Sequence, residues 1–166
     1  MYDNTNKRAI LIFPKFNNIE VIQDVRKKYD RLYGLIKPHI TLAFPFQDNI
    51  SDNLLREKIE GILNNTKSFK AIFKGVSLSE DNYIFLNCIE GKEKIIQIHD
   101  KIYEEVLPIH YKREREYIPH ITLGQSYNIE MLKDFNEKFE TIVDELTIEF
   151  IDKNEKSIVL DRIKLL

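Results

Sequence analysis

The sequence contains one cysteine, no long hydrophobic run and little net charge of either sign. Cys88 alone can form neither an internal disulfide nor a thiolate metal cage, which favours a reducing, cytoplasmic location. The longest apolar run near the N-terminus, residues 9–13, is far shorter than the roughly 20 residues of a membrane-spanning helix, and no basic leader precedes it. We therefore expect a protein that is neither secreted nor embedded in a membrane.

Several common cofactor and metal motifs are also missing. The sequence has no His-Glu-x-x-His, no paired cysteines and no closely spaced histidines, so nothing in it predicts a zinc site. The glycine-rich phosphate loops Gly-x-Gly-x-x-Gly and Gly-Lys-Ser/Thr are absent as well. We therefore expect neither a bound metal nor a cofactor.

The charge balance bears on the kind of partner. Lys and Arg number 25 against 27 Asp and Glu, a net charge of −2, whereas binding to long duplex nucleic acid usually needs a basic face. We expect no such partner. The 166 residues, 43% of them apolar, are typical of one folded domain, and we expect a single monomeric domain spanning residues 1–166.

Hydrophobic periodicity predicts short strands that alternate with helices. Ser51 is the expected N-cap of the second helix, and Gly75 interrupts the alternation of the third strand as a β-bulge would. Turn residues at 79–82 and 152–155 predict two hairpins. The seven predicted strands are residues 7–14, 39–46, 69–79, 83–89, 120–125, 146–152 and 157–164, and the four predicted helices are residues 19–33, 52–65, 92–106 and 130–143.

A five-residue segment occurs twice, once in each half of the chain. Pro-His-Ile-Thr-Leu spans residues 38–42 and again residues 119–123. Each copy falls on the middle strand of a strand–helix–strand–helix–strand series, which begins again at Tyr83 and is followed by one last strand. A chance match of this length has a probability of roughly a few per cent. Its equivalent placement favours a duplication, or two sites with the same geometric need.

The repeated segment places an imidazole beside a hydroxyl. In a strand, alternate side chains point to the same face, so His39 and Thr41 share one surface. Ile40, Leu42 and Phe44 would then face the core. A single His-x-Thr is most often an ordinary surface pair, but a core or solubility requirement does not explain the same polar pair twice.

The second copy presents His120 and Thr122 in the same way, which predicts one shared groove between the two strands. Because the pKa of an unperturbed histidine is near 6.5, such a pair can supply a general base and a general acid together. Threonine hydroxyls can donate hydrogen bonds to phosphate oxygens. The sequence therefore predicts acid–base cleavage of a phosphodiester, with no metal required.

With both motifs intact, the chain resembles the 2H phosphoesterase superfamily, and most of all its 2′-5′ RNA ligase-like branch. The resemblance also covers residues 9–13, 83–86 and 117–124. It implies an α+β, bilobal duplication in which two antiparallel sheets line a central cleft, with the motif strands central and the helices outside. It also implies metal-independent cleavage of a 2′,3′-cyclic phosphate, a 2′-5′ linkage or a related bond in a small nucleotide or RNA end.

Carried over residue by residue, the resemblance assigns His39 and His120 as acid and base, and Thr41 and Thr122 as phosphate-binding residues. A binding module that captures a nucleotide or RNA terminus without turnover is the alternative. Affinity without product would favour that alternative.

Two further segments are candidates for substrate contacts. Tyr83 and Phe85 share one face of their predicted strand, where Phe85 could stack on a base or simply pack at an edge. If residues 112–117 are extended, Arg113, Arg115 and Tyr117 share a face that could touch a phosphate or nucleobase. A solvated loop is the other interpretation of that segment.

Overall fold

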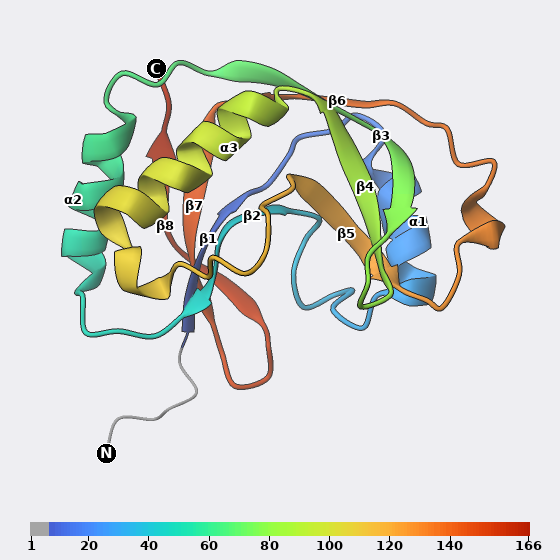
Figure 1. Ribbon diagram of the computed structural model, residues 1–166, viewed down its shortest axis with the longest axis horizontal. Helices are drawn as coiled ribbons and strands as arrows, with labels where there is room; N and C mark the ends of the chain where they lie inside the picture. The colour runs from blue at the N-terminus through green and yellow to red at the C-terminus, as the bar shows by residue number, and fades with distance from the viewer. Residues whose placement is uncertain (1–6) are drawn as a thin grey trace.

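The computed structural model describes residues 7–166 and contains two four-stranded antiparallel sheets with helices packed against them (Figure 1). The strand order is β2-β1-β7-β8 in the first sheet and β5-β4-β3-β6 in the second. The strands are β1 (Lys7–Ile12), β2 (Ile40–Phe46), β3 (Phe69–Leu78), β4 (Tyr83–Glu90), β5 (His120–Gln125), β6 (Phe139–Val143), β7 (Glu145–Ile151) and β8 (Ser157–Lys164). The helical elements are α1 (Ile19–Tyr29), α2 (Asp52–Leu63), α3 (Lys92–Lys101), the π-helical turn η1 (Ile102–Val106), and the 3-10 turns η2 (Pro108–His110) and η3 (Glu130–Leu132).

This architecture confirms the predicted α+β fold with two antiparallel sheets. The order β1-α1-β2-α2-β3 in the first half is followed by β4-α3-β5-η3-β6 in the second. The sheets do not coincide with the sequence halves, because β3 pairs with β4 and β6, while β7 and β8 complete the first sheet. Each sheet therefore contains strands from both halves of the chain.

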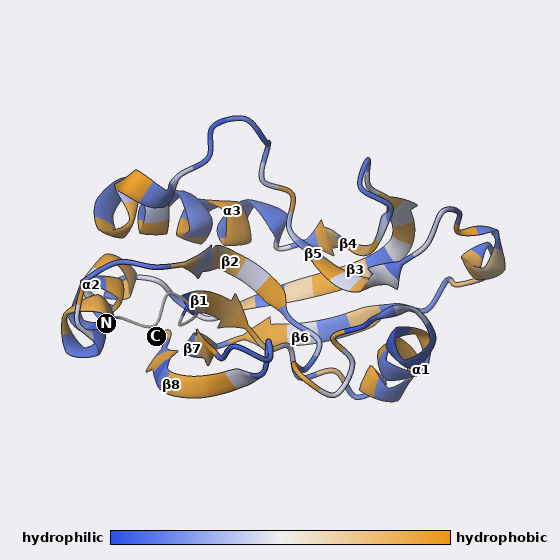
Figure 2. Ribbon diagram, turned by 90° about the horizontal axis from the view of Figure 1, so that it is seen from below, coloured by the Kyte–Doolittle hydropathy of each residue, from blue (hydrophilic) through white to orange (hydrophobic). Residues whose placement is uncertain are grey.

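The helices cross over between the halves. Helix α1 packs against β5 and α3 packs against β2, so the first helix of each half contacts the other half's motif strand. In Figure 2, α1 and α3 lie on opposite sides of the strands. The approach of α1 requires Gly124 in β5, because a Cβ built there would lie 2.4 Å from the Tyr29 carbonyl carbon. The two halves are thus packed into one body.

A continuous apolar core fills the space between the sheets and helices. The strands are mainly hydrophobic and most of the connecting loops hydrophilic (Figure 2), as expected when burial of apolar surface drives folding. The core residues form one cluster that includes Ile10, Leu42, Leu55, Phe73, Ile84, Leu86, Ile98, Ile121, Phe139 and Ile148.

The two motif strands share a β-bulge at the same place in the repeat. In β2 the register with β1 skips Leu42, between Thr41 and Ala43. In β5 the register with β4 skips Leu123, directly after Thr122. A bulge bends its strand and shifts the alternation of side chains beyond it. The repeated sequence therefore has a repeated local geometry.

This bulge corrects the predicted orientation of Phe44. Leu42 and Ala43 are both fully buried, and the side chains beyond them are out of phase with a regular strand. Phe44 is consequently 51% exposed instead of facing the core. Strict alternation from His39 would hold only in an unbulged strand.

The predicted helix at residues 130–143 is wrong. Only Glu130–Leu132 form a short 3-10 turn, and Phe139–Val143 form β6, which brings the strands within residues 7–166 to eight. Phe139, Thr141 and Val143 are buried while the residues between them are exposed, the period-two pattern of a strand that pairs with β3. The apolar residues of this segment fit either a helical or a strand periodicity, and pairing with β3 makes it a strand.

The other predicted elements are confirmed to within a few residues at their ends. The Ser51 hydroxyl accepts a hydrogen bond of 3.2 Å from the Leu54 amide and caps α2. The predicted bulge at Gly75 is present in β3, where the glycine has a φ of 82°. The helix expected at 92–106 is α-helical to Lys101 and continues as η1. Within residues 7–166, no helix combines the length and hydrophobicity needed to cross a lipid bilayer.

The motif strands are not central in their sheets. β2 is an edge strand of the first sheet and β5 is an edge strand of the second. The two edges contact each other in the middle of the molecule (Figure 1). The implied central position therefore holds for the molecule as a whole and is corrected for the individual sheets.

Candidate active site

The contact between β2 and β5 brings the two His-x-Thr segments together, although they lie 81 positions apart in the sequence. The Tyr117 hydroxyl, three residues before His120, donates a hydrogen bond of 2.7 Å to the Thr41 carbonyl. Both histidines and both threonines of the motifs are half-buried. The juxtaposition that the repeated pentapeptide predicts is therefore present in the fold.

Both motif histidines make the same hydrogen bond to their own backbone. His39 Nδ1 lies 2.8 Å from the Lys37 carbonyl oxygen, and His120 Nδ1 lies 2.6 Å from the Ile118 carbonyl oxygen. A carbonyl oxygen can only accept, so each Nδ1 carries the proton. This bond selects the tautomer in which Nε2 is the basic nitrogen of each neutral ring.

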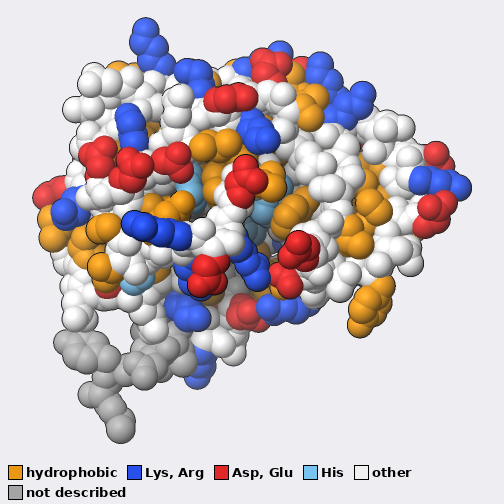
Figure 3. All heavy atoms as spheres, in the orientation of Figure 1, with side chains coloured by type: hydrophobic (Ala, Val, Ile, Leu, Met, Phe, Trp, Pro, Cys, Tyr) orange, Lys and Arg blue, Asp and Glu red, His pale blue; other side chains and the backbone are white. Residues whose placement is uncertain are grey.

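The two Nε2 atoms are not fully buried. Within residues 7–166, a single buried side-chain nitrogen or oxygen atom lacks a hydrogen-bond partner, and that atom is Glu149 Oε1. The Nε2 atoms of His39 and His120 make no hydrogen bond to the described part of the chain and are not in that class. In the space-filling view, the middle of this face is hollowed, and histidine side chains lie in the hollow (Figure 3). A bound molecule can therefore reach these nitrogens.

The surroundings favour the neutral form of both rings. Burial lowers the pKa of His39 from 6.5 to about 4, and the positive charge of Arg26 assists it, whereas the backbone hydrogen bond to Lys37 and the negative charge of Asp30 oppose it. Burial also lowers the pKa of His120, again against its backbone hydrogen bond. The contact between β2 and β5 places the two imidazoles at neighbouring strand edges. Near neutral pH, both Nε2 atoms of the free protein are proton acceptors.

Each imidazole also contacts a phenylalanine. The Phe85 ring stacks on His120 with centroids 3.6 Å apart and an interplanar angle of 18°. The Phe13 ring meets His39 edge-on at 6.2 Å and 65°. Tyr83, Phe85 and Asn87 alternate with buried residues as predicted. One face of the Phe85 ring therefore packs on the imidazole, and stacking of Phe85 on a base stays a prediction.

A buried polar residue in α1 supports the first motif, and the sequence interpretation missed it. Arg26 is 1% exposed, and its Nη2 donates a hydrogen bond of 2.8 Å to the carbonyl of Ile36, three residues before His39. Its Nε and Nη1 bond to Asp30 and Gln23 at 2.8 and 2.9 Å. The signal was an arginine on the apolar face of an amphipathic helix, where a buried charge needs fixed partners.

Helix α3 supports the second motif through His99, which is 4% exposed. The rings of His99 and Tyr117 stack in parallel, with centroids 3.7 Å apart and an angle of 4°. The ring and the hydroxyl of Tyr117 therefore both contact the protein, and its contact with substrate stays a prediction. Sequence periodicity identified the apolar side of α3 but could not identify this partner.

The segment before the second motif is not extended. Residues 113–115 form a turn, so Arg113, Arg115 and Tyr117 do not share the face of a strand. Arg113 is exposed, and Arg115 forms an exposed ion pair with Asp81 at 3.2 Å. The face proposed for these side chains is therefore wrong, and a substrate contact by either arginine stays a prediction.

Two exposed aromatic residues flank the motif strands. Tyr83, 40% exposed, lies on β4 opposite Gln125, and its substrate contact also stays a prediction. Phe44, 51% exposed, lies on β2 three residues after Thr41. Sequence alternation hid Phe44, since only the bulge turns it outward. Within residues 7–166, no three His, Cys, Asp or Glu side chains are grouped as metal ligands would be.

Residues 14–154 match the model of a family described as the 2′-5′ RNA ligase superfamily. A Bacillus licheniformis protein named "Putative phosphoesterase" is 30% identical over 128 residues, which cover 72% of this chain and 70% of that protein. A Staphylococcus aureus protein of the same name is 24% identical over 169 residues, covering 95% and 98%.

Solved structures share the fold. E. coli LigT in apo form aligns with a TM-score of 0.64 and 16% identity over 98% of this chain and 99% of LigT, and its complex with 3′-AMP aligns at 0.61 and 13% over the same shares. The Thermus thermophilus protein TT0787 aligns at 0.67 and 12%, covering 96% and 97%. At such low identity these likenesses establish the arrangement of strands and helices alone.

Proposed function

This chain belongs to the 2′-5′ RNA ligase superfamily of phosphoesterases, and from that membership we propose that it is a metal-independent phosphodiesterase acting on a small nucleotide or an RNA end. The resemblance drawn from the two His-x-Thr motifs is thereby confirmed at the level of the family. We propose as substrate a 2′,3′-cyclic phosphate, a 2′-5′ linkage or a related phosphodiester.

One observation carries the proposal: the two motif segments contact each other, and each imidazole has its Nδ1 held by its own backbone, which leaves Nε2 as the basic nitrogen. For hydrolysis of a cyclic phosphate, one Nε2 accepts a proton from the attacking water while a P–O bond forms. The other ring, protonated at Nε2, gives its proton to the departing ribose oxygen as the second P–O bond breaks. His39 and His120 are the proposed base and acid, in either order.

The bound substrate would itself favour protonation of the imidazole that acts as the acid. Both imidazoles are neutral in the free protein, but an approaching phosphodiester anion favours the charged form of a nearby ring. Binding therefore raises the pKa of the ring beside the leaving oxygen. The Thr41 and Thr122 hydroxyls would donate hydrogen bonds to the nonbridging oxygens, where they stabilise charge in the transition state.

A nucleotide also needs a contact for its base. Phe44 is an exposed ring on β2, the strand that contains Thr41 and directly follows His39, and base–aromatic stacking contributes about 1–3 kcal/mol. We propose Phe44 as a stacking surface. LigT, which shares this fold, was solved with 3′-AMP, and that ligand supports a nucleotide as the class of substrate.

A substrate panel tests the proposal. The protein is incubated with 2′,3′-cyclic nucleotides, 2′-5′ dinucleotides and cyclic dinucleotides, with and without a chelator, and products are separated by chromatography. Cleavage of at least one class, unchanged by the chelator, supports the proposal. Affinity without product would instead identify a binding module, and loss of turnover on chelation would identify a metal-dependent enzyme.

A further inference from the structure

The exposed edge of β2 is capped by two tyrosine hydroxyls from the second half of the chain. Tyr117 Oη donates to the Thr41 carbonyl at 2.7 Å, and Tyr103 Oη accepts from the Phe44 amide at 3.1 Å. An edge strand normally leaves such backbone groups to solvent or to another strand. Here they tie the first motif strand to residues that precede the second motif.

Contacts on both the ring and the hydroxyl hold the Tyr117 side chain in place. Its ring lies flat on His99, whose Nδ1 is 2.9 Å from Asp100 Oδ1. Burial raises the pKa of the Tyr117 hydroxyl, so it remains protonated. Because a carbonyl cannot donate, the hydroxyl must be the donor to Thr41. The contact therefore has a fixed direction and a short length.

The same residue leads directly into the second motif. Ile118, which follows Tyr117, supplies the carbonyl that accepts the hydrogen bond from His120 Nδ1. One short stretch of backbone therefore orients the imidazole of the second motif and holds the backbone of Thr41 in the first. A displacement of Tyr117 would change the separation of the two motifs.

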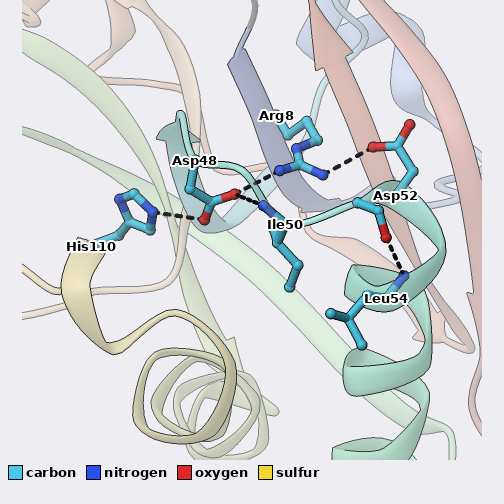
Figure 4. Close-up of polar contacts among 7 residues, drawn as sticks. Arg8, Asp48, Ile50, Asp52, Leu54 and His110 are labelled. Atoms are coloured by element: carbon cyan, nitrogen blue, oxygen red, sulfur yellow. Dashed lines mark hydrogen bonds and ion pairs between the residues drawn. The ribbon is translucent and has the colours of Figure 1, made fainter.

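The start of this connection is fastened as well. His110 Nε2 lies 2.9 Å from Asp48 Oδ2, just beyond the end of β2, and Asp48 Oδ1 accepts a bond of 2.7 Å from Arg8 (Figure 4). Arg8 also pairs with Asp52 at the start of α2 at 3.0 Å. Residues 110–117 are thus tied to the first half at both ends, near the end of β2 and at Thr41.

We propose that Tyr117 is a positioning residue that sets the distance between the two His-x-Thr segments by joining the backbone before His120 to that of Thr41. The proposal rests on the proposed function of these segments. No equivalent acts in the other direction: the residue three positions before His39 is Ile36, which has no polar side chain. The first motif therefore has no counterpart of Tyr117 at the matching position.

Tyr117→Phe tests the proposal, with Tyr103→Phe as the matched control. Each change removes one hydroxyl from a buried or half-buried ring that caps a backbone group of β2, so we expect similar falls in Tm. Only Tyr117→Phe should lower kcat, by about 10- to 100-fold with KM within about twofold, because small misplacements of reacting groups slow the chemical step. Equal kcat in both variants, high or low, would overturn the proposal.

A second measurement needs no substrate and separates this inference from the proposed function. NMR titration of the imidazoles should give His39 a pKa of about 4 in the wild type. Water entering a widened gap would raise that pKa toward 6.5 in Tyr117→Phe and leave it unchanged in Tyr103→Phe. This shift in a protein without turnover would support the positioning role and defeat the proposed function. Active protein with unchanged kcat and pKa in Tyr117→Phe would do the reverse.

Discussion

The two His-x-Thr segments are alike in themselves and different in what holds them. Both have the same five residues, the same bulge after the threonine, and an imidazole bonded to the carbonyl two residues before it. The first is supported by the buried guanidinium of Arg26, the second by the stacked rings of His99 and Tyr117. Contacts within each segment therefore give the same arrangement of histidine and threonine twice, whereas the residues that hold each segment in place differ.

The largest expected effect tests whether the two histidines are equivalent in catalysis. Alanine at His39 or at His120 should each lower kcat by about 10²- to 10⁴-fold, because each removes one of two required proton transfers. The double variant should be little worse than either single one, since the residues act as a unit. Turnover assays with Tm measurements as the folding control check this. Full activity in one variant would show that the two segments differ in role.

The supports should differ most in stability. Arg26→Met leaves the half-buried Asp30 carboxylate without its ion-pair partner, with a hydrogen bond from the Leu32 amide remaining, and should lower the free energy of unfolding by about 3 to 5 kcal/mol. His99→Phe keeps an aromatic ring against Tyr117 and should cost less than about 1.5 kcal/mol. Urea denaturation measures both. Equal losses of unfolding free energy would mean that the Arg26 hydrogen bonds and the His99–Tyr117 stack support their motifs to the same degree.

The threonines test the symmetry of phosphate binding. Valine has nearly the same shape but no hydroxyl, so Thr41→Val and Thr122→Val should each lower kcat by about 10- to 100-fold, with little change in Tm. We expect similar losses at the two positions because the hydroxyls occupy equivalent places in the repeat. A loss at one position only would assign the phosphate to one segment.

The pH dependence of kcat/KM should show the smallest but most diagnostic effect. Activity needs one ring protonated and the other neutral, and the pKa values of both rings lie below 6.5 in the free protein. Activity should therefore rise as pH increases from 4, peak below pH 6.5 and then decline as the acid loses its proton. The two limbs belong to the coupled pair and not to single residues. A maximum above pH 7 would contradict this.

Sequence patterns predicted the elements whose pattern is local. The paired pentapeptides, the Ser51 cap, the bulge at Gly75 and the hairpin turns each depend on a few adjacent residues. The helix predicted over residues 139–143 was wrong because their apolar spacing fits a helix nearly as well as a strand. Pairing with β3 makes the segment a strand. The predicted orientation of Phe44 toward the core was wrong for a related reason, because the bulge that turns it outward forms only when β2 pairs with β1.

The amino-acid sequence specified which groups do the proposed chemistry, because a histidine and a threonine two residues apart share a face where the backbone is extended and unbulged between them. Folding specified their environment. The pairing of edges β2 and β5, the burial that lowers both imidazole pKa values, and the Tyr117 bond to Thr41 all join residues distant in the chain. Contacts of that range follow from how the sheets and helices pack, and no local pattern encodes them.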